Sequence, residues 1–268
     1  MGWIIALLVL VLVYLFLIAP RMIRKPERSA LYGVHYAHRG LFDNETYAPE
    51  NSISAIRKAV EAGYGIEFDV QLSKDNVPVV FHDASLKRMC GVDGKVWEYT
   101  MEELQKMKLG KSNETIPTFA HVLEVIDGRV PLIIEYKMDR VDTKVCELGN
   151  ALLENYKGTY CIESFHPLAV MWYRKHRSDV IRGQLSENYK RSGKKAFSLW
   201  LMTHLLTNFL TRPDFIAYRH SDADNFSRRI CKALGALSVA WTVRSEEQYR
   251  KAKPHFDLFI FDSFIMED

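Results

Sequence analysis

Short apolar runs alternate with amphipathic segments along most of the chain. In the segment SISAIRKAVEAG (52–63), Ile53, Ile56 and Val60 form one helical stripe, and the pattern ends at Gly63, a residue common after a helix C-terminus. Similar patterns separate most of the apolar runs. Runs with the length and composition of strands lie at 34–38, 65–72, 77–82, 130–136, 159–164, 180–185, 215–219, 237–243 and 258–262. This alternation predicts an α/β fold with a parallel sheet.

One connection breaks the alternation. Only the short segment SKDN (73–76) separates the runs 65–72 and 77–82. Such a connection can join antiparallel strands, whereas a parallel crossover needs a dozen or more residues. We therefore expect a β-hairpin here. Without the second hairpin strand, eight strands alternate with helices, which is the pattern of a (β/α)8 TIM barrel. The long stretch at about 84–117 predicts a small insertion after the hairpin.

The first twenty residues are apolar and carry no charge. As a helix, residues 2–19 would be about 27 Å long, close to the thickness of the hydrocarbon core of a bilayer. No basic residue precedes this run and no small-residue cleavage site follows it, which argues against a cleaved signal peptide. We therefore expect a transmembrane anchor at 1–20, a basic juxtamembrane linker at 21–32 and the barrel at 33–268.

The net charge of +3 is concentrated next to the predicted anchor. The segment RMIRKPER (21–28) has four basic residues and one acidic residue, so the rest of the chain is neutral overall. By the positive-inside rule, we expect a single-pass membrane protein with the domain that follows the anchor in the cytoplasm. A local cluster of this kind does not indicate a nucleic-acid-binding surface. The cysteines lack metal-binding spacing and fit a reducing compartment.

Ionisable side chains stand at the ends of the predicted strands, where TIM barrels carry their active sites. Residues two apart on a strand point to the same face, so Glu67 and Asp69 share a face, as do Glu135 and Lys137. Carboxylates that converge in a barrel mouth cannot all stay charged and unpaired. A hard divalent cation with oxygen ligands would neutralise them.

Proton-transfer groups and further positive charges accompany these carboxylates. His38 and Arg39 end the first predicted strand, and His82 ends the hairpin strand. The two imidazoles could transfer protons, while Arg39 and Lys137 offer positive charge to an anion. Together with a metal ion, these groups are typical of a site that hydrolyses a phosphate ester.

Single residues of this set also have purely structural interpretations. Arg39 could have no role beyond an ion pair with Asp43 or Glu45. The segment ENS (50–52) could be no more than a capped helix start, and Trp241 could simply fill the barrel. The joint occurrence of these groups at successive strand ends favours the catalytic interpretation.

Six motifs follow one another in an order that resembles a known family. They are AHRG (37–40), APENS (48–52), GIEFDVQLSKDNVPVVFHD (65–83), IIEYK (133–137), ESFHP (163–167) and AWTV (240–243). The series is similar to that of the glycerophosphodiester phosphodiesterase family and covers essentially everything after the predicted anchor. The resemblance implies a (β/α)8 barrel with a small insertion.

The resemblance also implies a role for each of the candidate residues. It implies one divalent cation, Mg²⁺ or Ca²⁺, acid–base catalysis by two histidines, and a positively charged phosphate site. The residues concerned are Glu67, Asp69 and Glu135 for the metal, His38 and His82 for proton transfer, and Arg39, Lys137 and Trp241 for the substrate. The last strand departs from the family pattern, in which a Thr-Asp pair often precedes a proline, because it reads FDSF (261–264). The role of Asp262 therefore stays open.

The implied reaction is hydrolysis of glycerophosphodiesters to glycerol 3-phosphate and an alcohol. In the family mechanism, the hydroxyl beside the phosphoester attacks phosphorus, and water opens the resulting cyclic phosphate. An alternative is lysophospholipase D-type hydrolysis of lysophospholipids at the membrane. It depends on whether the Leu-, Phe- and Trp-rich segment 190–213 is an interfacial helix or an ordinary barrel helix. A catalytically inactive membrane adaptor is less favoured because the candidate set is complete. No obligate protein partner is indicated.

Overall fold

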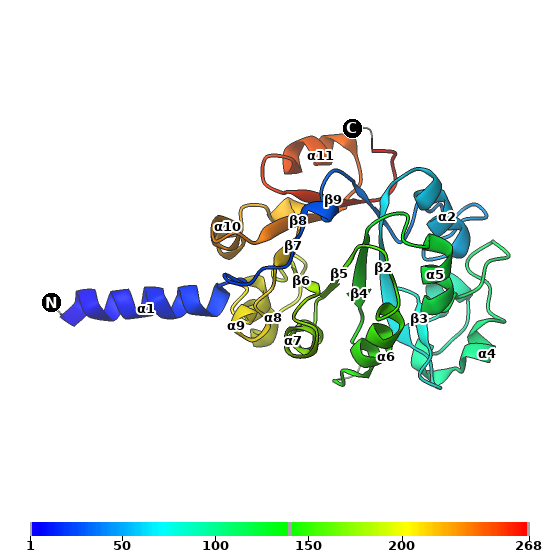
Figure 1. Cartoon of the computed structure of the whole chain (residues 1–268), viewed down its shortest axis with the longest axis horizontal. Coiled ribbons are helices and arrows are strands. Elements are labelled where there is room, and N and C mark those ends of the chain that lie inside the picture. The colour runs from blue at the N-terminus through cyan, green and yellow to red at the C-terminus, as the bar shows by residue number, and fades with distance from the viewer. Residues whose placement is uncertain (1, 139–140, 267–268) are drawn as a thin grey trace.

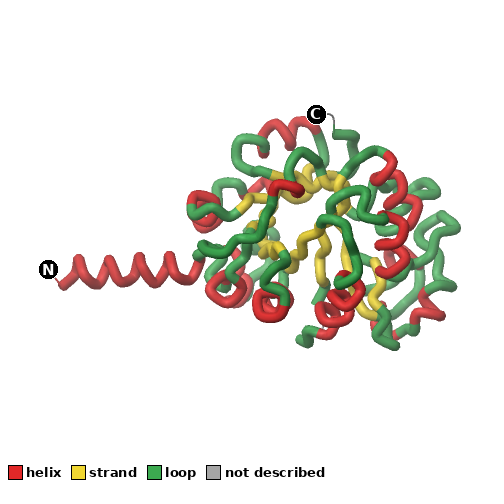
Figure 2. The backbone as a smooth tube through the Cα atoms, viewed as in Figure 1, coloured by secondary structure: helices red, strands yellow, loops and turns green. Residues whose placement is uncertain are grey.

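The computed structural model describes residues 2–138 and 141–266, and a barrel of eight parallel strands forms its centre (Figures 1 and 2). The strand order is β1-β9-β8-β7-β6-β5-β4-β2, and pairing of β1 with β2 closes the ring. The barrel strands are β1 (Tyr36–His38), β2 (Gly65–Leu72), β4 (Leu132–Tyr136), β5 (Tyr160–Ser164), β6 (Ile181–Ser186), β7 (Phe215–Arg219), β8 (Leu237–Val243) and β9 (Leu258–Phe261). The predicted TIM barrel is confirmed.

Helices surround the barrel and bury their apolar faces against it (Figure 2). The first of them begins at Ser52, whose side chain accepts a hydrogen bond from the Ala55 N–H and so caps the helix. Its buried residues include Ile56 and Val60, on the stripe that the sequence predicts. The surrounding helices are α2 (Ile53–Glu61), α5 (Phe119–Ile126), α6 (Lys144–Leu153), α7 (Pro167–His176), α8 (Phe197–Thr203), α9 (Asn208–Thr211), the short η3 (His220–Asp222), α10 (Phe226–Ala233) and α11 (Glu246–Ala252).

The hairpin and the insertion lie where the sequence indicates them. Strand β3 (Pro78–Val80) runs antiparallel to β2, with Gln71 opposite Val79. Between β3 and α5 the chain forms α3 (Lys87–Cys90), η2 (Val96–Glu98) and α4 (Met101–Leu104). These elements enclose a small apolar core of their own, which includes Phe81, Met89 and Leu104.

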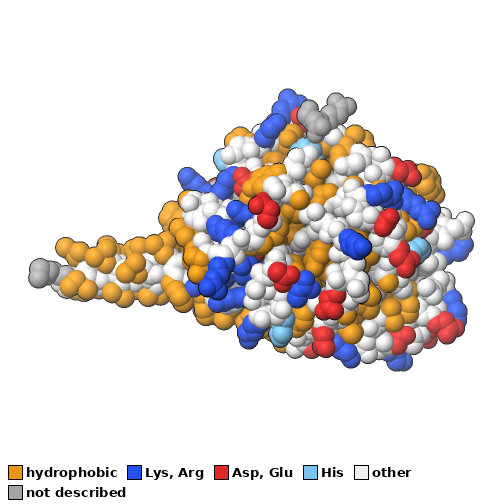
Figure 3. All heavy atoms as spheres, viewed as in Figure 1, with side chains coloured by type: hydrophobic (Ala, Val, Ile, Leu, Met, Phe, Trp, Pro, Cys, Tyr) orange, Lys and Arg blue, Asp and Glu red, His pale blue; other side chains and the backbone are white. Residues whose placement is uncertain are grey.

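An apolar helix, α1 (Gly2–Ile18), projects from the barrel beside α9 and α10 (Figures 1 and 3). Most of its side chains are exposed, and Trp3 is 90% exposed. Within residues 2–138 and 141–266, no helix combines the length and the apolar character needed to cross a membrane. The transmembrane anchor therefore stays a prediction.

The segment after α1 is attached to the barrel by its basic side chains. The Arg21 guanidinium donates to the Ser178 carbonyl at 2.8 Å, and the Lys25 ammonium donates to the Gly235 carbonyl at 2.9 Å. At the end of the short helix η1 (Ser29–Leu31), the Leu31 side chain packs into the apolar cluster inside the barrel. Part of the predicted basic linker thus forms one unit with the barrel.

The apolar segment 190–213 forms two short helices, α8 and α9, where the sequence suggests a single one. The chain turns at Leu205, which adopts a left-handed φ of 55° and is completely buried. Phe197 and Trp200 on α8 are 75% and 51% exposed. Contact of this segment with a membrane stays a prediction.

Candidate functional site

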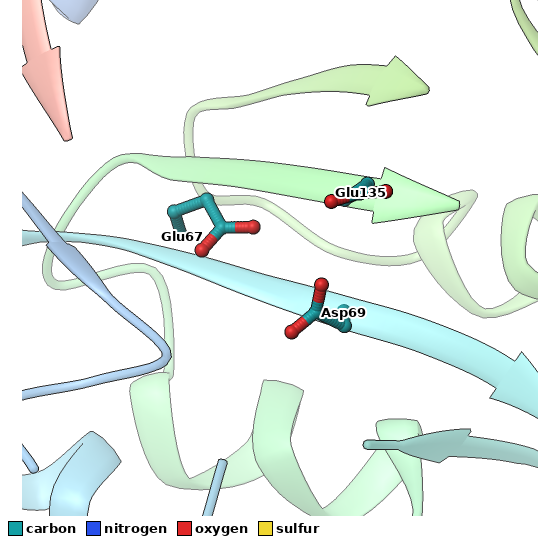
Figure 4. Close-up of side chains that lie close together, drawn as sticks. All are labelled: Glu67, Asp69 and Glu135. Carbon is teal, nitrogen blue, oxygen red and sulfur yellow. The ribbon is translucent and has the colours of Figure 1, made fainter. Parts of the chain in front are cut away.

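Three buried carboxylates meet inside the barrel near the C-terminal ends of β2 and β4 (Figure 4). Asp69 lies directly opposite Glu135 in the parallel register, and Glu67 lies two residues earlier on the face that Asp69 shares. One oxygen from each residue lies within 4.8 Å of the other two. Oxygen atoms that each lie about 2.0–2.6 Å from one Mg²⁺ or Ca²⁺ are separated from one another by distances within this limit. This buried acidic triad could therefore hold a divalent ion.

The charges around the triad also favour a cation. Burial raises the pKa of Glu67, and the carboxylates of Asp69 and Glu135 raise it further. Burial would also raise the pKa of Asp69, but the electrostatic influence of Lys137 and Arg39 and of the neighbouring histidines outweighs it and holds that pKa well below its usual value. The Lys137 ammonium lies 2.9 Å from Asp69 Oδ1 and 2.7 Å from Glu135 Oε2. One ammonium cannot neutralise the whole triad, so the pKa values of Glu67 and Glu135 are both raised, and a divalent cation would supply the missing positive charge.

His38 is oriented by a carboxylate from the last strand. Its Nδ1 lies 2.8 Å from Asp262 Oδ2, and Arg244 Nε donates to the other oxygen of Asp262 at 2.9 Å. Burial and the nearby Arg39 lower the His38 pKa to about 4, so the imidazole is neutral at neutral pH. With Nδ1–H donating to Asp262, the Nε2 atom faces the triad, 3.9 Å from Glu67 Oε2. Asp262, whose role the sequence leaves open, thus positions His38.

A matching arrangement holds His82 on the hairpin side. Its Nδ1 lies 2.6 Å from Asp83 Oδ1, and Arg88 Nε donates to Asp83 Oδ2 at 2.6 Å. Burial would raise the pKa of Asp83, but the hydrogen bonds from His82 and Arg88 outweigh it and lower this pKa. Each of the two predicted catalytic histidines therefore has an aspartate at Nδ1 and an arginine behind that aspartate.

The motif AHRG forms a strained turn that turns the Arg39 side chain toward the site. Arg39 has a left-handed φ of 58°, and its N–H donates to the Glu67 carbonyl at 2.7 Å. Gly40 follows with a φ of 82°, and a Cβ there would lie 2.7 Å from the Ala55 carbonyl carbon. The Asn51 N–H donates to the Arg39 carbonyl at 2.9 Å and joins the APENS motif to this turn. Because of this φ and this close approach, only glycine fits at position 40.

Arg39 pairs with Glu50 rather than with Asp43 or Glu45. Its NH1 lies 2.6 Å from Glu50 Oε1, and Arg88 donates to the same carboxylate at 2.7 Å. Glu50 is 4% exposed. The residue therefore does more than begin a helix: it links the Arg39 turn to the arginine that holds Asp83.

Trp241 lies on β8, where it covers the apolar cluster inside the barrel. Its ring packs edge-on against Phe165 with the centroids 5.3 Å apart, and the Arg219 guanidinium lies 5.6 Å from the ring centroid. Its Nε1 is buried and has no hydrogen-bond partner among the described residues. A substrate contact by Trp241 stays a prediction.

Residues 38–264 match the model of the Glycerophosphoryl diester phosphodiesterase family. The chain belongs to this family. It is 42% identical over 238 residues to a glycerophosphodiester phosphodiesterase of Caldanaerobacter subterraneus, covering 84% of this chain and 92% of that protein. It is 29% identical over 268 residues to human glycerophosphodiester phosphodiesterase 1, covering 85% and 77% of the two chains. The predicted family, and with it a phosphodiesterase, is confirmed.

Solved structures of two phosphodiesterases share the fold. A glycerophosphodiester phosphodiesterase from Thermotoga maritima has a TM-score of 0.64 at 26% identity, covering 87% of this chain and 96% of its own. A phosphodiesterase from Oleispira antarctica, in complex with the product sn-glycerol-3-phosphate, has a TM-score of 0.71 at 24% identity, covering 87% and 94%.

One buried carboxylate of this family member is absent from the sequence-based candidate set. Glu163 lies opposite Glu135 in the register of β4 and β5 and is 1% exposed. Its Oε2 has no hydrogen-bond partner within the described part of the chain. Burial and the neighbouring Glu135 raise its pKa well above the usual value. The motif ESFHP contains this residue, but only the strand register brings it to the triad.

Proposed function

We propose that this phosphodiesterase hydrolyses glycerophosphodiesters to glycerol 3-phosphate and an alcohol. The observation that carries the proposal is the pair of aspartate-bound histidines, His38 and His82, beside one buried carboxylate triad. The family and the names of its similar members support the substrate class. An inactive adaptor would have no need of two matched His–Asp–Arg arrangements.

The two histidines divide the proton transfers. In the first step, the hydroxyl beside the phosphoester attacks phosphorus, one imidazole removes its proton, and the other imidazole protonates the leaving alcohol. A cyclic phosphate forms, and water opens it with the roles exchanged. Because Asp262 and Asp83 occupy the Nδ1 atoms, the Nε2 atoms of both rings are the ones that exchange protons. Trp241 would pack against the glycerol side of the substrate.

Positive charge at the site binds the phosphate. Arg39 and Lys137 lie partly buried beside the triad and are the groups proposed to hold the phosphoryl oxygens. Glu67, Asp69 and Glu135 would hold one Mg²⁺ or Ca²⁺, which would neutralise charge on the phosphate and lower the pKa of the attacking hydroxyl.

We also propose that the protein is attached to a membrane through α1, with the barrel on the cytoplasmic side. The exposed apolar surface of this helix and the basic segment after it support the proposal. Hydrogen bonds join the barrel to the C-terminal end of α1. Arg212 donates to the Phe16 and Ala19 carbonyls at 2.9 Å. The Asn208 side chain donates to the Ile18 carbonyl at 2.9 Å. The barrel is therefore held in a defined orientation relative to the helix.

Purified protein incubated with glycerophosphocholine and Mg²⁺ or Ca²⁺ tests the activity. We expect release of glycerol 3-phosphate and choline, with a cyclic phosphate visible by ³¹P NMR. A substrate analogue that lacks the hydroxyl beside the phosphoester should not react. Turnover of that analogue at the rate of glycerophosphocholine would exclude the cyclic intermediate.

Protease added to intact cells tests the proposed sidedness. It should leave the barrel uncut, and digestion of the barrel would reverse the proposed sidedness.

Lysophospholipids are a second candidate substrate class. They contain the same glycerol phosphodiester, and the proposed membrane attachment would bring the barrel close to them. The observation that favours them is an apolar cavity beside the triad.

A further inference from the structure

A cavity of about 540 Å³ opens directly beside the triad. Glu135 and Lys137 are among its lining residues, so the cavity adjoins groups of the reaction site. Most of the surface of the cavity is nevertheless apolar. Its apolar side chains include Met138, Phe165, Tyr189, Leu199, Leu201 and Met202. A mostly apolar lining beside the charged groups of a reaction site is typical of a site for an amphiphilic ligand.

Helix α8 forms one wall of this cavity. Leu199 and Leu201 face the cavity, whereas Phe197 and Trp200 are largely exposed and do not line it. The Phe197 and Trp200 rings stack on each other with their centroids 6.0 Å apart. The helix therefore presents apolar side chains both to the cavity and to its outer surface.

Hydrogen bonds to the barrel hold this wall in place. The Ser186 hydroxyl donates to the Met202 carbonyl at 2.8 Å, and the Tyr218 hydroxyl donates to the Thr203 carbonyl at 2.9 Å. The Tyr189 N–H donates to the Thr203 hydroxyl at 3.2 Å. Because buried barrel residues fix the end of α8, the cavity is part of the folded structure.

We propose that this cavity binds the acyl chain of a lysophospholipid whose phosphodiester lies at the triad. The inference rests on the proposed function, because it uses the same reaction site. A soluble glycerophosphodiester offers nothing apolar to fill the cavity. A lysophospholipid has a phosphate for Lys137 and one acyl chain, carried by the glycerol, for the wall formed by Leu199, Leu201 and Met202.

The reaction on this substrate is the same phosphodiester hydrolysis. The free glycerol hydroxyl attacks phosphorus, the P–O bond to the headgroup alcohol breaks, and that alcohol leaves with a proton from a histidine. One water then opens the cyclic phosphate. The products are the headgroup alcohol and an acylglycerol phosphate, and the acyl ester is not touched.

A series of 1-acyl-glycerophosphocholines that differ only in chain length tests the proposal. All are kept monomeric, below their critical micelle concentrations, so that membrane binding plays no part. We expect kcat/KM to rise by up to about fourfold for each methylene that becomes buried, until the chain fills the cavity. Turnover of glycerophosphocholine without any gain along the series would overturn the acyl site but not the proposed function. Absence of turnover on every diester would overturn the proposed function itself.

Neighbouring residues on α8 provide a matched pair of variants. Leu201→Arg places a charge in the cavity and should lower the ratio of acylated to unacylated turnover at least about tenfold. Trp200→Arg places the same charge on the outer face and should leave that ratio unchanged. If Leu201→Arg fails to fold, Leu201→Trp is used instead, which should stop the gain at a shorter chain. An unchanged ratio in Leu201→Arg, or an unchanged chain-length limit in Leu201→Trp, contradicts the proposal.

Discussion

Replacement of Lys137 by methionine tests the electrostatic balance of the buried triad. The Lys137 ammonium lies 2.7 Å from Glu135 and 2.9 Å from Asp69, and its side chain is 15% exposed. Methionine retains much of the apolar stem and removes the charge. In the variant, the carboxylates of Asp69 and Glu135 therefore stay buried with less positive charge beside them.

The size of the effect follows from this burial. Removing one partner of a buried ion pair costs about 3–5 kcal/mol of unfolding free energy. Burial already raises the pKa of Glu135, so this carboxyl can take up a proton instead of remaining charged, and we expect the lower end, about 3 kcal/mol. For a chain of this size, that corresponds to a fall in Tm of about 6–12 °C.

Thermal unfolding in EDTA, followed by circular dichroism, measures this effect. Lys111→Met is the matched control, because its ion pair with Glu45 has the same 2.6–2.9 Å geometry but both side chains are 76% exposed. We expect no measurable change in the control. Saturating Mg²⁺ or Ca²⁺ should recover much of the loss in Lys137→Met, since a divalent ion neutralises the same oxygens. A Tm for Lys137→Met in EDTA equal to that of the wild type would refute this reasoning.

The remaining predictions concern catalysis, metal and packing. His38→Ala and His82→Ala should each lower kcat on the preferred substrate about 10²- to 10⁴-fold with an unchanged circular dichroism spectrum, and normal turnover in either would sink the mechanism. Exhaustive EDTA treatment should abolish turnover, Mg²⁺ or Ca²⁺ should restore it, and Glu67→Gln should weaken metal binding measured by calorimetry; full activity without metal would exclude the ion. Gly183→Ala should cost about 1–3 kcal/mol in denaturant unfolding because the new Cβ would overlap the Phe215 ring, and wild-type stability would contradict that packing.

Local pattern was sufficient for the architecture and for the centre of the site. The alternation of strand and helix periods predicted the barrel, and a connection too short for a crossover predicted the antiparallel β3. The two-residue period of a strand put Glu67 and Asp69 on one face, and the shared end of parallel strands brought Glu135 to them. These inferences succeed because they depend on periods and connection lengths within short stretches, and on the parallel sheet that the alternation of these stretches implies.

The partners of these residues depended on the closed barrel. Asp262 reaches His38 from 224 residues away because β9 pairs with β1, and the predicted barrel did not by itself indicate which side chains of these two strands meet. Glu163 lies beside Glu135 of the triad through the register of β4 and β5.

The sequence also did not predict that Glu50 pairs with Arg39, or that the segment 190–213 divides into α8 and α9. Hydrophobic periodicity reports which side of an element is buried. Which charged groups meet across the barrel, and where a cavity remains, is decided only when the elements pack together.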